Sequence, residues 1–248
     1  LRHTGFSLDQ IAENLWFNLN KGVFGSITNI VVNVVLIFVL FGVLLENTGA
    51  GETLLKYAFK LTQKTRGGPA HAAILASGLF GTMSGSPVAN IVGTGTFTIP
   101  IIKKRGFSPA FSAGVEATAS CGGQIMPPIM GAAALVMADL AGIPYLYLIT
   151  AALLPAFFYY LSLFMGVTVE ARKQGIEPIV DLDAYKISPQ DRLNAIMFVA
   201  PILSVIISLA SGFSPAMAGF FALVVLLVCS FINPRVRQDP LRLVRGLI

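Results

Sequence analysis

Two apolar segments, each too short to cross a bilayer, flank a polar turn, and this pattern restricts the fold more than any other feature. Residues 69–83 and 88–102 contain 15 residues each, which corresponds to about 22 Å of helix against the roughly 30 Å of a bilayer core. The turn between them contains Ser84-Gly85-Ser86-Pro87. Non-helical backbone at membrane depth is tolerated only where protein buries it or where it lines a cavity. We therefore expect a re-entrant helical hairpin over residues 69–102 whose tip faces an ion or a substrate.

The composition indicates a polytopic membrane protein with an all-α fold. Of the 248 residues, 55% are hydrophobic and 12% are charged, which is about half the charged fraction of a typical soluble domain. The basic residues lie in short clusters between apolar runs, so the net charge of +5 reflects membrane topology and not nucleic-acid binding. Cys121 and Cys229 lie in apolar surroundings and form neither a disulfide framework nor a metal-binding spacing. Because the sequence begins with Leu1, we expect a fragment of a longer protein.

Alternating apolar and polar stretches divide the chain into five segments. We expect an extracytoplasmic amphipathic segment (1–25), a helical unit (26–167) with the hairpin (69–102) and a broken helix (110–140), a cytoplasmic loop with a short helix (168–190), two further transmembrane helices (191–233) and a basic cytoplasmic tail (234–248). Spanning helices are expected at residues 27–45, 144–167, 194–210 and 215–232.

The distribution of basic residues supports the hairpin. If both hairpin ends face the cytoplasm, 15 of the 17 lysine and arginine residues lie on that side, and only Arg2 and Lys21 lie outside. The positive-inside rule favours this asymmetry. A single crossing by residues 69–102 would place Arg66 and the basic cluster 103–105 on opposite sides and would weaken it.

The hairpin tip offers groups that suit an ion. Ser86 and Pro87 have the side chains preferred at the N-cap and the first position of a helix. The end of one helix presents free carbonyl groups, and the start of the next presents free amide groups. Carbonyl and hydroxyl oxygens suit a small cation, whereas a helix N-terminus suits an anionic group. A packing interface of small residues between helices is the alternative.

A second interruption lies in residues 117–128. Gly122-Gly123 and Pro127-Pro128 bracket the polar Gln124 within an apolar run, and these residue types break helices. A simple kink is the alternative, but a kink requires only one proline, so an unwound stretch is favoured. Interrupted apolar segments are the sequence pattern that best indicates a transporter binding site.

Three ionisable residues lie close to these interruptions. Glu116 and Asp139 are either intramembrane acids on an ion or proton pathway or residues in interfacial water, and the sequence leaves both interpretations open. We expect His71, near the hairpin entrance, on the surface. It is at least 13 residues from either tip serine, about 20 Å along a helix, which excludes a serine–histidine catalytic pair. The chain is therefore not expected to be an enzyme.

Residues 77–90, 94–100 and 122–134, together with 41–51 and 170–175, resemble the large membrane subunit (DctM-like) of TRAP transporters, the tripartite ATP-independent periplasmic transporters. The likeness covers roughly residues 24–245 and is strongest to fused permeases. The hairpin and the Pro-Pro interruption are its specific parts. Pro87 departs from the serine often found in the family at that place, which removes a hydroxyl group and an amide.

The resemblance implies an elevator-type transporter, built as an inverted repeat, that couples organic-anion transport to Na⁺ in a bacterial or archaeal cytoplasmic membrane. It implies no organic cofactor. The implied partners are a periplasmic solute-binding protein, small-subunit helices, the lipid bilayer and a second repeat; residues 26–167 would be the first repeat. The implied sodium site consists of Ser84, Gly85, Ser86, Asn90 and the carbonyl groups around Ala119, Ser120 and Gly122, and the residues implied near the substrate are Thr94, Gln124 and Pro127.

Two other functions stay open at this point. One is a different anion or ion transporter, or a channel, with the same hairpin architecture. The other is a non-transporting membrane scaffold from a truncated gene. Na⁺-dependent uptake that also requires a soluble binding protein separates the TRAP function from the first, and a second hairpin in the downstream genomic sequence argues against the second.

Overall fold

The computed structural model describes residues 5–18, 22–48, 50–178, 187–231 and 233–238, and these residues form helices and turns without a strand. The parts of the predicted terminal segments and cytoplasmic loop at 1–4, 19–21, 179–186 and 239–248 lie outside the described residues. The helices are α1 (Leu8–Ala12), η1 (Glu13–Phe17), α2 (Ser26–Ile30), η2 (Val31–Val35), α3 (Leu36–Asn47), α4 (Ala50–Thr62), α5 (Gly68–Ser84), α6 (Pro87–Asn90), η3 (Ile91–Gly95), α7 (Thr96–Lys104), α8 (Pro109–Gly122), α9 (Ala132–Ala141), α10 (Tyr145–Lys173), α11 (Pro189–Ala210), α12 (Pro215–Ser230) and α13 (Pro234–Gln238).

The predicted class, an all-α polytopic membrane protein, is confirmed. Within the described residues, three helices are long and apolar enough to cross a membrane, namely Ser26–Leu45, Tyr145–Lys173 and Pro189–Ala210. Helix α12 is equally apolar in character but contains 16 residues. Only 11% of the most apolar window of α10 is buried. Most of this apolar surface is therefore available to lipid or to further protein.

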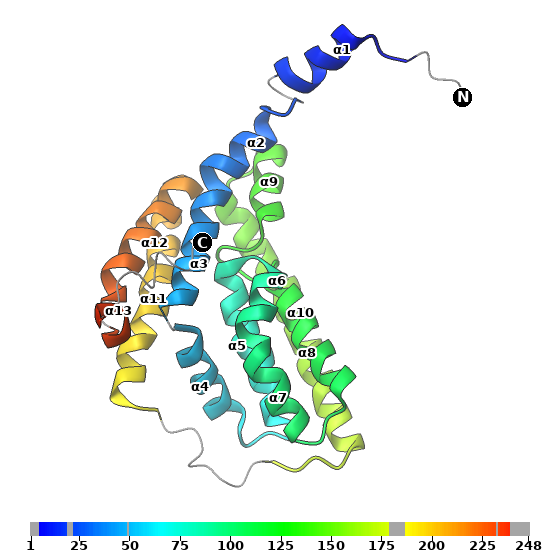
Figure 1. The fold of residues 1–248 in the computed structure, drawn as a ribbon, viewed down its shortest axis with the longest axis vertical. Helices are drawn as coiled ribbons and strands as arrows, with labels where there is room; N and C mark the ends of the chain where they lie inside the picture. Colours follow the sequence, from blue (N-terminus) through cyan, green and yellow to red (C-terminus); the bar gives the residue numbers. More distant parts are fainter. Residues whose placement is uncertain (1–4, 19–21, 49, 179–186, 232, 239–248) are drawn as a thin grey trace.

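Helices α5, α6 and α7 form an antiparallel hairpin, with the turn between α5 and α6 at its tip (Figure 1). Gly85 ends α5 in the left-handed conformation, with a φ of 57° that a glycine adopts without strain. The Ser86 hydroxyl then accepts a hydrogen bond from the Ala89 amide, and Pro87 occupies the first turn of α6. The predicted positions of Ser86 at the N-cap and of Pro87 in the first turn are thus confirmed. The depth of this hairpin in a bilayer stays a prediction.

The hairpin ends lie together with other segment ends. Figure 1 shows the start of α5, the end of α7, the C-terminal end of α10 and the start of α11 at the same end of the bundle. Lys103 and Lys104 are in the last turn of α7, and Arg172 and Lys173 are in the last turn of α10. These basic residues, which the sequence analysis predicts on one side of the membrane, are therefore at one end of the molecule.

Three apolar clusters hold the helices together, and the smallest joins α4 to α5 through Phe59 and Ala72. Of the other two, one joins α3, α9, α11 and α12 and includes Phe41, Val205 and Leu226. The second joins α5, α7, α8 and α10, and it includes Ile74 and Ile102. Because the second cluster packs both arms of the hairpin against α8 and α10, it fixes the hairpin tip relative to the end of α8.

The prediction that His71 lies on the surface is wrong. Its side chain is 1% exposed and stacks on the ring of Phe164 in α10, with 3.7 Å between ring centroids. One ring nitrogen, Nδ1, lies 2.7 Å from the Thr65 hydroxyl, and Nε2 lies 3.1 Å from both the Phe164 carbonyl and the Thr168 hydroxyl. Phe164 lies 93 residues beyond His71 in the sequence. Helix α10 therefore covers the entrance of the hairpin, and its Phe164 carbonyl and Thr168 hydroxyl groups are partners of the buried imidazole.

Candidate functional site

The helix break lies where the sequence predicts it. Helix α8 ends at Gly122, and α9 begins at Ala132 after a stretch of turns that contains a cis peptide bond between Pro127 and Pro128. Within this stretch the Gly131 amide donates to the Gln124 carbonyl at 2.8 Å. The hydroxyl of Tyr145, at the start of α10, donates to the Ile129 carbonyl. The break is therefore an ordered loop with internal hydrogen bonds rather than a kink in one helix.

The hairpin tip and the helix break are in direct contact. A Cβ atom built on Gly81 would lie 2.5 Å from the Gly123 Cα atom, so the backbones of α5 and α8 touch there. At the tip itself, a Cβ atom on Gly85 would clash with the Met130 carbonyl oxygen and lie 3.2 Å from the Gly131 Cα atom. Glycine is required at these positions because no side chain fits between the two backbones. The two interruptions that the sequence identifies separately therefore lie against each other.

At the tip, the Ser84 hydroxyl is a buried polar group without a partner. Its Oγ atom is inaccessible to solvent and forms no hydrogen bond with the described residues. Ser86, by contrast, uses its hydroxyl for the cap of α6. The Gly85 amide donates to the Gly81 carbonyl at 3.0 Å. Of the two tip hydroxyl groups, that of Ser84 therefore has no hydrogen-bond partner among the described residues.

Asn90 lies inside the hairpin and joins its two arms. The side chain is fully buried, and its Nδ2 atom donates to the Ser77 carbonyl in α5 at 2.8 Å. Its Oδ1 atom lies 3.3 Å from the Thr94 hydroxyl. Asn90 therefore links the two hairpin arms behind the tip, and its amide oxygen is still able to accept a second hydrogen bond.

The predicted carbonyl ligands of α8 already accept hydrogen bonds. The Ala119 carbonyl accepts from the Tyr160 hydroxyl at 3.0 Å. The Ser120 and Gly122 carbonyls each accept from a following backbone amide, at 3.1 Å. Each carbonyl oxygen has a second lone pair, so these bonds orient the groups without using their whole capacity.

The three residues predicted near the substrate have different environments. Thr94 is 6% exposed, and its hydroxyl contacts Glu116 at 2.5 Å. Gln124 is exposed on the loop of the break, and Pro127 is buried in it. The structure therefore assigns Thr94 to the interior of the hairpin and leaves Gln124 accessible.

The sequence left two environments open for Glu116, an intramembrane position and interfacial water. The structure places its side chain between the two hairpin arms and α8. The side chain is 0% exposed and accepts hydrogen bonds from hydroxyl groups of both hairpin arms and of α8 itself. The donors are Ser77 (2.6 Å), Thr94 (2.5 Å), Thr98 (2.6 Å) and Ser120 (3.4 Å). Asp139, the other acid of this segment, is exposed. The signal available in the sequence was a lone acid inside a small-residue helix, four positions before a serine.

The described residues contain no group of three or more histidine, cysteine, aspartate and glutamate side chains that could hold a metal ion. The oxygens at the tip and break are hydroxyl, amide and backbone carbonyl groups. This set suits a hard monovalent cation better than a transition metal, which prefers nitrogen or sulfur ligands.

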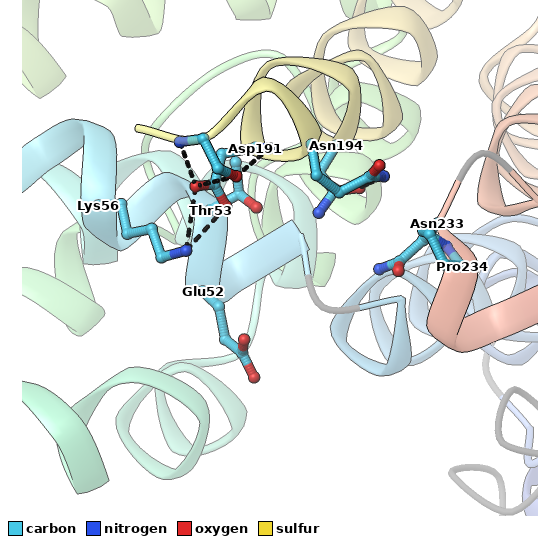
Figure 2. Close-up of a pocket in the computed structure, with 9 residues that line it drawn as sticks. Glu52, Thr53, Lys56, Asp191, Asn194, Asn233 and Pro234 are labelled. Atoms are coloured by element: carbon cyan, nitrogen blue, oxygen red, sulfur yellow. Dashed lines mark hydrogen bonds and ion pairs between the residues drawn. The ribbon is translucent and has the colours of Figure 1, made fainter. Parts of the chain in front are cut away.

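A polar cavity lies elsewhere, between α4, α11 and α13. Figure 2 shows Lys56 directed at Asp191, with hydrogen bonds of 2.8 and 3.1 Å from Nζ to the two carboxylate oxygens. Asp191 also accepts from the amide and hydroxyl groups of Ser188, the N-cap residue of α11, so the two residues form a capping box. The cavity is lined by Glu52, Thr53, Lys56, Ser188, Gln190, Asp191, Asn194, Asn233 and Pro234. None of the predicted sodium or substrate residues is among them.

Comparison with known proteins identifies the family. A family model described as the tripartite ATP-independent periplasmic transporter, DctM component, matches residues 4–244. Residues of the hairpin, the break and α10–α12 all fall within this match.

Several relatives are named as transporter permeases. The C4-dicarboxylate TRAP transporter large permease protein DctM of Pseudomonas aeruginosa is 28% identical over 189 residues, which are 75% of this chain and 43% of that protein. The sialic acid TRAP transporter large permease protein SiaM of Vibrio cholerae is 33% identical over 104 residues, 42% of this chain and 24% of that protein. The isethionate TRAP transporter permease protein DctMQ of Oleidesulfovibrio alaskensis is 32% identical over 105 residues, 42% of this chain and 16% of that protein.

The chain thus spans less than half the length of each of these relatives. The family match nevertheless covers nearly the whole chain. The chain is a multi-pass membrane protein that belongs to the DctM component family of the tripartite ATP-independent periplasmic transporters.

Proposed function

We propose that the chain is part of a sodium-coupled secondary transporter that carries an organic anion across the cytoplasmic membrane. The names of its relatives specify C4-dicarboxylates, sialic acid and isethionate, all of which are small organic acids. The fold supports this function because broken helices and helical hairpins are the elements from which secondary transporters build their central binding sites.

The observation that carries the sodium assignment is the Ser84 hydroxyl. A buried polar group without a partner costs about 1–3 kcal/mol, and native proteins leave few such groups. Ser84 lies at the tip, beside the contact of Gly85 with Met130 and Gly131. A cation bound there would satisfy the hydroxyl oxygen and supply positive charge beside an anionic substrate.

The chain's own groups have distinct roles in this proposal. Ser84, the Asn90 side-chain oxygen and backbone carbonyls of the tip and of the α8 end provide oxygens for the cation. Helix α9 begins at Ala132 without a side-chain cap, so its first amide groups and the exposed Gln124 are the candidate donors to a substrate carboxylate or sulfonate. Gly85 and Gly81 permit the close contact that keeps these two sets together.

The proposed assembly includes components beyond this chain. A solute-binding protein would deliver the substrate from the periplasm, and small-subunit helices would accompany the large subunit. Because the chain spans less than half of its relatives, a second repeat would complete the substrate site and the elevator-type motion.

The test is uptake by the complete permease in proteoliposomes with its binding protein. We expect Ser84→Ala to raise the Na⁺ concentration for half-maximal uptake about tenfold, since one charge-assisted ligand is worth about 1.5 kcal/mol. The matched control is Ser162→Ala in α10, which removes an exposed hydroxyl that bonds within its own helix at 2.8 Å, and we expect no change in the Na⁺ dependence.

Three outcomes would contradict the proposal. Equal Na⁺ dependence in the wild type and Ser84→Ala would remove the tip from the ion site. Uptake without the binding protein would indicate another hairpin-type transporter or a channel. No uptake of any organic acid by a correctly folded complete permease would favour the scaffold function.

A further inference from the structure

Glu116 is a fully buried carboxylate whose hydrogen-bond partners are all hydroxyl groups. Ser77 and Thr94 donate to Oε1 at 2.6 and 2.5 Å, and Thr98 donates to Oε2 at 2.6 Å. Ser120 lies 3.4 Å from Oε1. The four hydroxyl groups come from α5, η3, α7 and α8. We call Glu116 and these four residues the hydroxyl cage.

The hydroxyl cage contains no compensating positive charge. In the part of the chain that the structure describes, the ion pairs join Lys56 to Asp191, Arg66 to Glu177 and Lys173 to Glu170, and none involves Glu116. The short donor–acceptor distances are typical of hydroxyl groups that donate to a carboxylate. Hydroxyl dipoles solvate a buried negative charge but do not neutralise it, so the cage projects a negative potential into its surroundings.

The cage is directly connected to the predicted sodium residues. Ser120 belongs to both sets, and the Thr94 hydroxyl lies 3.3 Å from Asn90 Oδ1. A cation bound to an oxygen of Asn90 or Ser120, at the usual metal–oxygen distance of about 2.4 Å, would lie within about 8 Å of the Glu116 carboxylate. The hydroxyl groups close tightly around the carboxylate, so Glu116 acts on the cation through its charge and not as a ligand.

We propose that Glu116 supplies the buried negative charge that gives the hairpin-tip site its affinity for Na⁺. This inference rests on the proposed sodium site. A charge about 8 Å away in a medium of effective dielectric constant about 20 changes cation affinity about 30-fold. Glu116 is thus a positioning residue for the coupling ion, held behind the tip by the same hydroxyl groups that join the hairpin to α8.

The experiment measures Na⁺ binding through thermal stabilisation of the complete permease in detergent. NaCl is exchanged for choline chloride at constant ionic strength, and the Na⁺ concentration at half-maximal stabilisation is recorded. For Glu116→Gln, which keeps the shape and removes the charge, we expect this concentration to rise about 30-fold. The sodium-free unfolding temperature should stay unchanged or rise, because an uncompensated buried charge is removed.

Two further variants separate charge from structure. Thr98→Val removes one donor of the cage and keeps the charge, so we expect lower sodium-free stability with a Na⁺ midpoint within about threefold of the wild type. Glu116→Asp retains the charge on a shorter side chain, and its Na⁺ midpoint should lie closer to that of the wild type than to that of Glu116→Gln.

A wild-type Na⁺ midpoint in Glu116→Gln, accompanied by reduced sodium-free stability, would overturn the inference and leave Glu116 a structural link. Failure of Glu116→Gln to fold in sodium-free buffer would count against it in the same way. If Ser84→Ala still weakens Na⁺ stabilisation, the proposed sodium site survives that result. Absence of Na⁺ stabilisation in the wild type would instead refute the proposed function itself.

Discussion

The contact between Gly81 and Gly123 leads to a sharp prediction about stability. Gly81 lies inside α5, and Gly123 follows the last residue of α8. A Cβ atom on Gly81 would lie 2.5 Å from the Gly123 Cα atom, against an ordinary van der Waals contact of 3.4–4 Å. Both contacting groups are backbone, so no side-chain rotation relieves the overlap. Gly81→Ala therefore requires α5 and the end of α8 to separate by roughly 0.9 Å.

The expected magnitude follows from two opposing effects. Overpacking of a close contact costs about 1–3 kcal/mol. Replacement of glycine by alanine within a helix stabilises by about 0.5–1 kcal/mol, because the unfolded chain loses conformational freedom. We expect Gly81→Ala to lower the free energy of unfolding by about 1–2 kcal/mol.

Gly114→Ala is the matched control. Gly114 is in the middle of α8, and nothing lies within 4 Å of a Cβ atom built on it. Only the stabilising effect of replacing a helical glycine remains, so Gly114→Ala should raise the free energy of unfolding by about 0.5–1 kcal/mol. Chemical denaturation of the two variants in detergent should therefore separate them by about 1.5–3 kcal/mol. Equal stabilisation of both variants would refute the close approach of α5 to α8.

Two other variants test contacts away from the tip. Lys56→Met leaves the carboxylate of Asp191, whose side chain is 7% exposed, without its cation, and chemical denaturation should show a free energy of unfolding lower by about 1–2 kcal/mol. The control, Lys60→Met on the exposed face of α4, should change this free energy by less than about 0.5 kcal/mol. Equal effects of the two variants would contradict the role of the ion pair. His71→Phe keeps the stacking on Phe164 and removes the hydrogen bonds of the imidazole. The Thr65 and Thr168 hydroxyl groups keep their bonds to the Thr62 and Phe164 carbonyls, so we expect a loss of only about 0.5–1.5 kcal/mol by the same measurement, and a loss above about 3 kcal/mol would contradict this assignment.

The hairpin was predictable because its determinants are local. Gly85 ends one helix, and Ser86 and Pro87 start the next, so three adjacent residues specify the turn. The break after Gly122 was predictable for the same reason, since two glycines and two prolines fall within seven residues. Polarity alone then indicated that both interruptions serve a binding site.

The partners of buried polar groups were not predictable, because they come from distant segments. His71 was expected on the surface, yet it is satisfied by α10, whose Thr168 is 97 residues away in sequence. Glu116 receives hydroxyl groups from Ser77 and Thr98, which are 39 and 18 residues away. The sequence shows that such a residue is polar or ionisable, but it does not show which distant segments pack around it. That packing decides whether the residue is buried or exposed.

The close contact between Gly81 and Gly123 lies next to the hydroxyl cage. Gly81 is one helical turn beyond Ser77, and Gly123 is three residues beyond Ser120, so the backbone contact continues directly into two of the cage hydroxyl groups. A separation of α5 from α8 by about 0.9 Å lengthens the cage hydrogen bonds and also moves the tip away from the Glu116 charge. Coulomb energy varies slowly over such a distance at about 8 Å, whereas a hydrogen bond weakens steeply. The proposed cation oxygens also come from both the tip and the end of α8, so the same separation moves them apart. Gly81→Ala should therefore reduce stability and Na⁺ affinity together, whereas Glu116→Gln should reduce Na⁺ affinity without a loss of stability.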